Sequence, residues 1–141
     1  PSDWEIDDPR ITVQGDTTGH WLAISRKAGE TEQPSATAAV AIPTGARTIR
    51  VTARLRARGV RPGAEDWHLP GMFIHVRDGN GQRVDQPSAP AALLERDTPE
   101  WTVLTSEFPV PPAGRVVQVH LTVCGPAGTL EADDVTVEAD P

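Results

Sequence analysis

Residues 49–59, with the sequence IRVTARLRARG, decide the fold class of this chain. Aliphatic or alanine side chains alternate with polar ones from Ile49 to Arg58. Because successive side chains of a strand point to opposite faces, this pattern predicts a half-buried strand with one wall in a core and one in water. Four guanidinium groups on an open sheet face favour a binding module over an enzyme. We call them the arginine row: Arg50, Arg54, Arg56 and Arg58.

Strands of the same kind occur on the C-terminal side of this stretch. In residues 72–77 and 116–124, apolar side chains again occupy every second position, which is typical of antiparallel sheets covered on one side. Turn signals separate the strands, and DGNG at 78–81 is the strongest hairpin signal in the chain. Residues 90–95 favour a loop with one helical turn. We predict one all-β domain over residues 1–141, an antiparallel β-sandwich of the jelly-roll type. The expected strands are 11–14, 21–25, 36–42, 49–58, 72–77, 101–108, 116–123 and 130–138.

Length and charge exclude several classes of protein. The 141 residues suffice for one domain with its own core. A net charge of -7, from 13 Lys+Arg against 20 Asp+Glu, disfavours a nucleic-acid binder. No apolar run approaches the roughly 20 residues of a membrane helix, so no membrane partner is expected. No signal peptide is visible and the chain begins at Pro1, which favours a mature fragment or an excised module of a longer protein.

Motifs that would indicate catalysis are missing from the sequence. There is no G-x-S-x-G, P-loop or Cys–His signature, and the four histidines lack zinc spacing. The acidic pairs at 7–8, 65–66 and 133–134 invite a glycosidase interpretation, but neighbouring acids alternate faces on a strand or diverge on a loop. Cys124, the single cysteine, excludes an internal disulfide and is expected to be a half-buried thiol. An esterase or lyase would rest only on scattered acids and histidines, so we expect no enzyme.

Two interpretations compete for the arginine row. If it shares a sheet face with His75, Arg77, Gln118 and His120, that face suits an acidic polysaccharide, because guanidinium binds carboxylate and sulfate through paired hydrogen bonds. If it lies on the other sheet, it is a solvated face whose charge is balanced by acids, which is the commoner case.

The sequence also leaves two roles possible for the tryptophans, sugar binding and core packing. Trp67, in a polar and turn-rich segment, either stacks on a pyranose ring or plugs one end of the sandwich, and the second is favoured. Trp101 opens a strand and is expected to serve packing. Trp21 is an exposed indole if Leu22 and Ile24 face the core, and Trp4 is close to the terminus.

Five segments together resemble a known group of accessory domains. They are Val40–Ala46, Gly59–Trp67, Phe73–Gly81, Trp101–Pro111 and Leu130–Val135, and they span most of the chain. They resemble the galactose-binding-like β-sandwich domains attached to bacterial glycoside hydrolases, the carbohydrate-binding modules of families 4, 9 and 22. The resemblance implies a non-catalytic module that binds glycan along a concave sheet. It also implies a structural calcium held between a last-strand aspartate, here Asp133, and an N-terminal acid, here Glu5 or Asp7.

The chain differs from this group in having few aromatic residues. It has no Tyr, two Phe and four Trp, whereas glycan clefts typically use exposed aromatic platforms. The glycine-rich N-terminal opening of those modules is also absent.

Residues and resemblance lead to one functional prediction. We expect a monomeric polysaccharide-binding module of a secreted carbohydrate-active enzyme, joined in cis to the catalytic domain and holding calcium through Asp133 and Glu5. The alternative is a structural β-sandwich that packs on a neighbouring catalytic domain and binds no sugar. The expected ligand-binding residues are Trp67, Arg54, Arg56, His75, Arg77, Gln118 and His120.

Overall fold

The computed structural model describes residues 11–16, 19–27, 29, 34–61, 63–64, 68–84 and 90–141, with side chains described from Trp21 onward. The described residues form nine strands and no helix, which confirms the all-β prediction. No segment among them is therefore a helix that could cross a membrane. The strands are β1 (Ile11–Asp16), β2 (Gly19–Arg26), β3 (Ser35–Ala41), β4 (Thr48–Arg61), β5 (Pro70–Arg77), β6 (Ala92–Leu93), β7 (Thr98–Pro109), β8 (Val116–Val123) and β9 (Ala127–Asp140).

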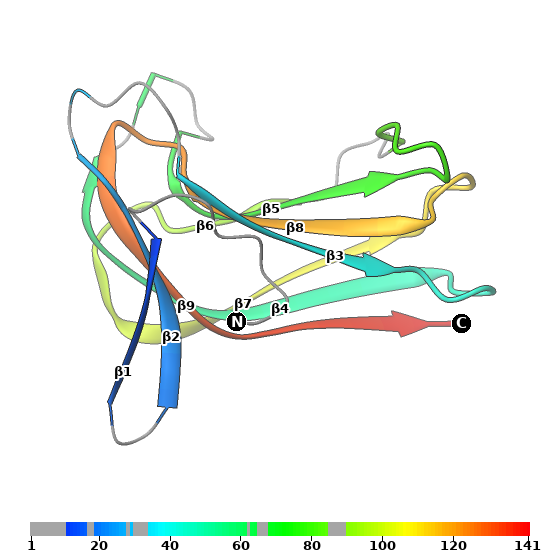
Figure 1. The fold of residues 1–141 in the computed structure, drawn as a ribbon, viewed down its shortest axis with the longest axis horizontal. Helices are drawn as coiled ribbons and strands as arrows, with labels where there is room; N and C mark the ends of the chain where they lie inside the picture. The colour runs from blue at the N-terminus through cyan, green and yellow to red at the C-terminus, as the bar shows by residue number, and fades with distance from the viewer. Residues whose placement is uncertain are drawn as a thin grey trace.

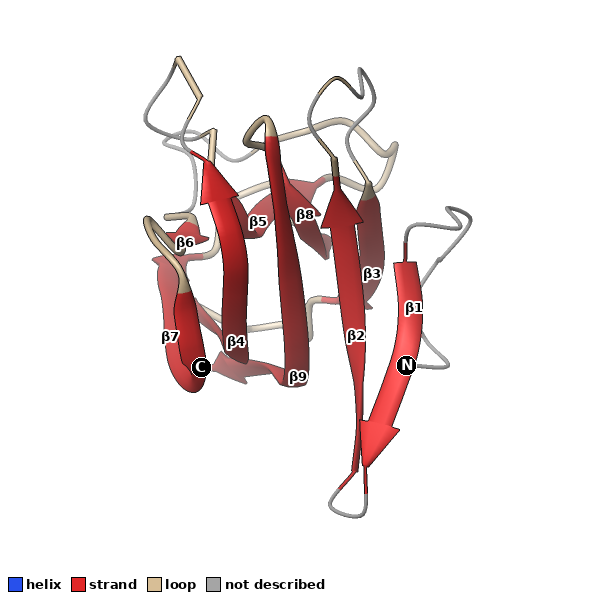
Figure 2. Cartoon of the chain, turned by 90° about the vertical axis from the view of Figure 1, so that its left-hand side faces the viewer, coloured by secondary structure: helices blue, strands red, loops and turns tan. Residues whose placement is uncertain are grey.

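The strands form two sheets that face each other (Figures 1 and 2). One has five strands in the order β1-β2-β9-β4-β7, and the other has four in the order β3-β8-β5-β6. Neighbouring strands in both sheets run antiparallel. This arrangement is the predicted jelly-roll type of β-sandwich, with one outer face on each sheet.

The core lies between the sheets and follows the alternation read from the sequence. On β4 every second residue from Ile49 to Ala57 is at most 3% exposed, and Met72, Ile74 and Val76 of β5 are buried on the opposing sheet. Full burial of such a side chain stabilises the fold by about 1.5–3 kcal/mol for the larger aliphatic residues. The same alternation leaves the polar residues of these strands on the two outer faces.

A β-bulge on β9 changes which side chains share a face. Thr52 of β4 is opposite Thr136, but Arg54 is opposite Asp133, so β9 carries one extra residue between the two pairs. Asp134 takes up this residue with a φ of 49°, a left-handed conformation that aspartate tolerates better than most residues. The bulge puts the carboxylates of both Asp133 and Asp134 beside Arg54, whereas consecutive strand residues normally face opposite ways.

The helical turn favoured for residues 90–95 does not form. Ala92 and Leu93 make the short strand β6 against Gly71 and Met72 of β5, and Leu94 N–H donates to the Pro70 carbonyl at 2.9 Å. A Cβ on Gly71 would collide with the β6 backbone, so glycine permits this close approach. Pairing with the sheet edge outweighs the local helical preference here.

Candidate functional site

The structure divides the predicted site residues between opposite outer faces of the sandwich. Arg54 and Arg56 lie on β4 in the five-stranded sheet. The other described members lie on β5 and β8 in the four-stranded sheet. Trp67, Glu5 and Asp7 lie outside the described residues, so their roles stay predictions. The predicted site residues on the four-stranded sheet are His75, Arg77, Gln118 and His120.

The arginine row faces acids on the strands beside it. Arg50 Nε donates to Glu107 Oε2 of β7 at 2.9 Å. Arg54 NH1 lies 3.2 Å from Asp134 Oδ2 of β9. Of the two interpretations, the structure therefore supports the one in which the arginine row is a solvated face balanced by acids. The row does not share a surface with the histidines.

Arg56 makes the most buried of these ion pairs. Its Nε and NH2 donate to the two carboxylate oxygens of Glu131 at 3.2 and 3.1 Å, and Glu131 is only 7% exposed. The guanidinium carbon lies 4.2 Å from the ring centroid of Trp101 and 5.0 Å from that of Trp21. The two indoles meet edge to face at 5.9 Å. Trp21 and Trp101 thus cover the Arg56–Glu131 pair, and Trp101 packs as expected.

One polar atom of this cluster lacks a hydrogen-bond partner among the described residues. The Nε1 atom of Trp21 is buried and finds no acceptor among the described residues. A buried donor without an acceptor costs about 1–3 kcal/mol relative to a satisfied one. The two half-buried indoles contact each other and the guanidinium of Arg56, so we assign the cluster to packing.

The structure describes the surroundings of Asp133, one of the two predicted calcium ligands. Asp133 Oδ2 lies 3.9 Å from Arg54 NH1, and its Oδ1 accepts the Asp134 N–H at 2.9 Å. Among the described residues no group of three or more acidic, histidine or cysteine side chains gathers where a cation would bind. The Arg54 guanidinium beside this carboxylate supplies a positive charge near the position that a calcium ion would take. Ligation that includes Glu5 stays a prediction.

The outer face of the four-stranded sheet brings two histidines together. The rings of His75 and His120 are 4.8 Å apart between centroids and tilted by 60°. His120 Nδ1 is 3.1 Å from Thr37 Oγ1 on β3, and its Nε2 is buried without a hydrogen-bond partner among the described residues. Burial, followed by the charges of His75, Arg77 and Arg83, lowers the pKa of His120 from 6.5 to about 4. His120 is therefore neutral at pH 7.

Arg77 and Gln118 extend this face toward one end of the sheet. Arg77 Nε donates to Gln118 Oε1 at 2.6 Å, and its NH1 donates to the Gly81 carbonyl at 3.0 Å. Gln118 is opposite His75 in the pairing of β5 with β8. The histidine pair, the amide and the guanidinium therefore form one continuous polar surface. We call it the histidine face, and it also includes Thr37 and Phe73.

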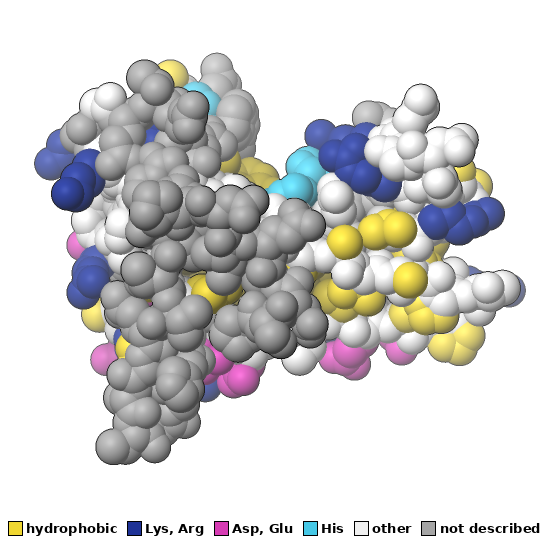
Figure 3. Space-filling model, viewed as in Figure 1, with side chains coloured by type: hydrophobic (Ala, Val, Ile, Leu, Met, Phe, Trp, Pro, Cys, Tyr) yellow, Lys and Arg dark blue, Asp and Glu magenta, His cyan; other side chains and the backbone are white. Residues whose placement is uncertain are grey.

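The histidine face is hollowed. Figure 3 shows a depression over β5 and β8 with histidine surface inside it and Lys or Arg side chains on one wall. The acidic side chains visible in that view gather along the opposite, five-stranded side. Among the described residues that point outward from β3, β5, β6 and β8, none is Asp or Glu.

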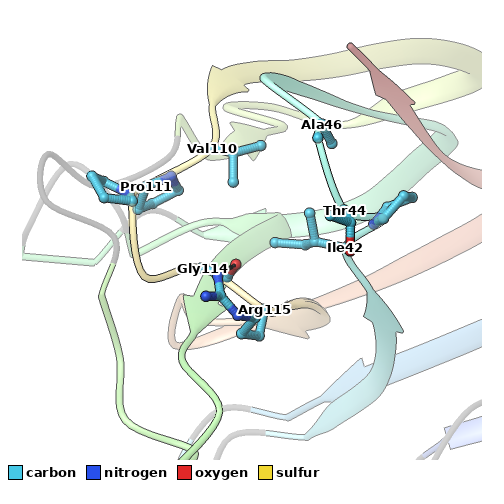
Figure 4. Close-up of a pocket in the computed structure, with 10 residues that line it drawn as sticks. Ile42, Thr44, Ala46, Val110, Pro111, Gly114 and Arg115 are labelled. Carbon is cyan, nitrogen blue, oxygen red and sulfur yellow. Dashed lines mark hydrogen bonds between the residues drawn. The ribbon is translucent and has the colours of Figure 1, made fainter.

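A second hollow lies at the end of the sandwich where β9 finishes. It has a volume of about 340 Å³ between the turn at 42–46 and the turn at 110–115 (Figure 4). Its backbone groups are largely used within the turns: Ala46 N–H donates to Pro43 and Gly114 N–H to Pro111. Arg115 supplies the only charged side chain among its lining residues. The hollow has no aromatic surface and lies apart from the predicted site residues.

The predicted binding residues did not include Thr37 or Phe73, which both lie on the histidine face. Alternation in 35–41 places Thr37 on the side opposite Ala36, and the same rule places Phe73 with His75. That signal was present, but no local pattern shows that β3 pairs with β8. Burial also raises the pKa of the half-buried Cys124 thiol, which opposes a nucleophilic role.

Comparison with known proteins gives structural but no sequence matches. No protein-family profile matches the chain. No curated protein sequence matches it either. The likeness is to solved structures of 10 to 19% identity, so it establishes the fold.

Most of the similar structures are carbohydrate-binding modules. The N-terminal cellulose-binding domain of β-1,4-glucanase C from Cellulomonas fimi is 17% identical with a TM-score of 0.61, covering 100% of this chain and 91% of that one. The CBM22-1 and GH10 modules of Clostridium thermocellum xylanase 10B, solved with xylohexaose, match at 12% identity and a TM-score of 0.61, covering 99% of this chain and 26% of that one.

A phage protein has the same fold. Tailspike protein 4 of bacteriophage CBA120 matches with a TM-score of 0.73 and 12% identity. The match covers 99% of this chain but only 20% of the tailspike chain. The sandwich of this chain is thus the fold found in carbohydrate-binding modules and in a segment of a much longer protein.

Proposed function

We propose that this chain is a non-catalytic module that binds polysaccharide on the histidine face. The observation that carries the proposal is a hollowed polar surface on one sheet of a carbohydrate-binding-module fold. His75 and Gln118 lie opposite each other on adjacent strands there, with the His120 ring beside them, and these polar side chains line the path of a chain lying across the sheet. An extended glycan needs this kind of open and rigid surface.

The proposal includes the setting of the module. A solved relative of this fold is joined to a GH10 catalytic module, which supports attachment in cis to a carbohydrate-active enzyme. Secretion follows from that role, because polysaccharide substrates lie outside the cell. Monomeric binding fits a site that one chain builds entirely from its own strands.

The competing structural function has less support. A domain that only packs on a catalytic partner is expected to expose a contiguous apolar patch. The exposed large hydrophobic residues among those described are Val40 at 40% and Val103 at 61%. They lie on β3 and β7, in different sheets, and single exposed aliphatic side chains are normal. A polar hollow therefore favours ligand binding over packing.

Affinity electrophoresis against neutral and acidic polysaccharides tests the proposal, with calorimetry for any that retard the chain. We expect retention by at least one polysaccharide and at least a tenfold loss of affinity in the double variant His75→Ala/His120→Ala. The matched control, Arg50→Ala on the opposite face, should bind as the parent chain does. Retention by no polysaccharide, or an equal loss in the control, would overturn the proposal.

A further inference from the structure

We infer that the histidine face takes an anionic glycan, with the carboxylate or sulfate of a sugar residue bound by Arg77 and Gln118. This inference rests on the proposed function and narrows it to a substrate class. It comes from the distribution of charge between the two outer faces and from the hydrogen-bonding groups that the histidine face leaves available.

The acids of the described sheets gather on one face. Six carboxylates lie on β7 and β9 within 4.0 Å of arginines from β4, and they pair with those arginines. The net charge of -7 therefore does not describe the histidine face, where no described outward side chain is acidic. The six are Glu107, Glu131, Asp133, Asp134, Glu138 and Asp140.

Arg77 keeps its charge without a carboxylate among the described residues. Both of its side-chain acceptors are neutral: the Gln118 amide oxygen and the Gly81 carbonyl. A guanidinium has five N–H donors, so these two contacts orient the group and leave donors available. Held in this way, the group is positioned to receive a ligand anion in a paired, charge-assisted contact.

Gln118 adds a donor beside that guanidinium. Its oxygen accepts the Arg77 Nε–H at 2.6 Å, which leaves its NH₂ group to donate elsewhere. His75 lies opposite Gln118 across the strand pair, and the neutral His120 lies beside it. The described residues of this surface supply guanidinium and amide donors and no carboxylate acceptor, which suits a group that only accepts hydrogen bonds, as carboxylate and sulfate do.

The described residues of this face offer little aromatic surface for stacking on a sugar. Phe73 is the one Phe or Trp among its described outward residues, while Trp21 and Trp101 are on the opposite face. Hydrogen bonds to an ionised group are roughly twice as strong as neutral ones. Among the described residues, the strongest contacts this face can make are therefore charge-assisted, which favours a charged sugar.

Matched polysaccharides that differ in charge alone test this inference on the full chain. Polygalacturonate is compared with its fully methyl-esterified form, and dextran sulfate with dextran, by calorimetry at fixed ionic strength. We expect binding to at least one anionic member and at least a tenfold weaker affinity for its uncharged counterpart. The polygalacturonate and dextran sulfate arms separate carboxylate from sulfate recognition.

Variants then place the anion at Arg77. We expect Arg77→Gln to lose at least tenfold in affinity for the anionic glycan and Arg77→Lys to fall between it and the parent. Arg50→Gln, which removes one charge from the opposite face, should leave affinity within twofold. Thermal melting of each variant separates lost binding from lost folding, and Gln118→Ala provides a second variant that leaves the charge in place.

Four results would overturn the inference. Equal binding of charged and uncharged partners would do so while leaving the proposed function intact. An equal effect of Arg50→Gln would show non-specific attraction. Binding of neutral glycans alone would place the module with neutral-sugar binders, whereas binding of no polysaccharide at all would remove the proposed function as well.

Discussion

Arginine occupies both outer faces of the sandwich, and its surroundings differ completely between them. On the five-stranded sheet, Arg56 is bound by both oxygens of Glu131 and covered by two indoles. On the four-stranded sheet, Arg77 is held by an amide oxygen and a backbone carbonyl, with no carboxylate among the described residues. The charge of Arg56 is balanced by a carboxylate within the fold. Arg77 is held in a fixed orientation by neutral groups, and no described carboxylate balances its charge.

This difference teaches that a row of arginines in sequence is a poor guide to a binding surface. The arginine row is conspicuous because four of its members lie within nine residues, yet strands β7 and β9 neutralise its described ion-paired members. Arg77 is inconspicuous in sequence. What decides the role of each arginine is the strand that lies next to it.

Removing the buried acid should have the largest effect on the five-stranded face. Glu131→Ala leaves the guanidinium of Arg56 under Trp21 and Trp101 without its counter-charge. Because an unpaired buried charge is strongly destabilising, we expect a loss of about 2–3 kcal/mol in the free energy of unfolding, moderated by the partial exposure of Arg56. Urea denaturation measures the loss.

The exposed pair on the same face provides the control. Glu107→Ala breaks the Arg50–Glu107 contact, whose side chains are 38% and 52% exposed. Exposed ion pairs contribute little to stability, so we expect a much smaller loss than in Glu131→Ala. Equal losses in the two variants would show that burial by the indoles does not distinguish the pairs.

On the histidine face, His120 should make stability depend on pH. Its pKa in the folded chain is about 4, below the ordinary 6.5, chiefly because of burial and then because His75, Arg77 and Arg83 are close. The unfolded chain therefore takes up the proton first as the pH falls. The stability due to neutral His120 is complete above pH 6.5, is lost progressively down to about pH 4, and is constant below that.

The difference between the parent chain and His120→Gln isolates this contribution. We expect the parent to lose on the order of 1–2 kcal/mol more than the variant between pH 6.5 and pH 4, since solvent screening reduces the full effect. Urea unfolding at several pH values provides the measurement. Parallel pH profiles for the two chains would contradict the assignment.

The two indoles over Arg56 should respond differently to the same substitution. Trp101 lies against both Arg54 and Arg56, so Trp101→Phe weakens two cation–π contacts and should cost about 1 kcal/mol. Trp21→Phe also removes a buried N–H that has no acceptor among the described residues, which offsets much of its lost packing. We expect Trp21→Phe to stay within about 0.5 kcal/mol of the parent chain. A larger cost for Trp21→Phe in urea unfolding would contradict this reasoning.

Much of the fold was predictable because alternation is a local property. The burial of Ile49, Val51 and Leu55 follows from their spacing alone, and the strand at 72–77 follows in the same way. The DGNG turn also behaves as expected, since Asp78 Oδ1 accepts the backbone N–H groups of Asn80 and Gln82. Local sequence therefore predicts strands, turns and the buried side of each strand.

Features that depend on pairing between distant strands were not predictable. The bulge that turns Asp133 and Asp134 toward Arg54 arises from the register of β9 against β4, 80 residues apart in the case of Arg54 and Asp134. The short β6 strand likewise replaces the favoured helical turn because β5 presents an edge with Gly71. Neither event has a signature in the segment where it occurs.

The sequence by itself determined that this chain is all-β and which side of each strand is buried, because side-chain direction in a strand depends only on position along it. The tertiary structure alone decided that the arginine row and the pair His75 and His120 lie on opposite faces. The order of strands in a sheet is set by packing and hydrogen bonding between segments far apart in the chain. Charges on two strands neutralise each other only when that order makes the strands neighbours.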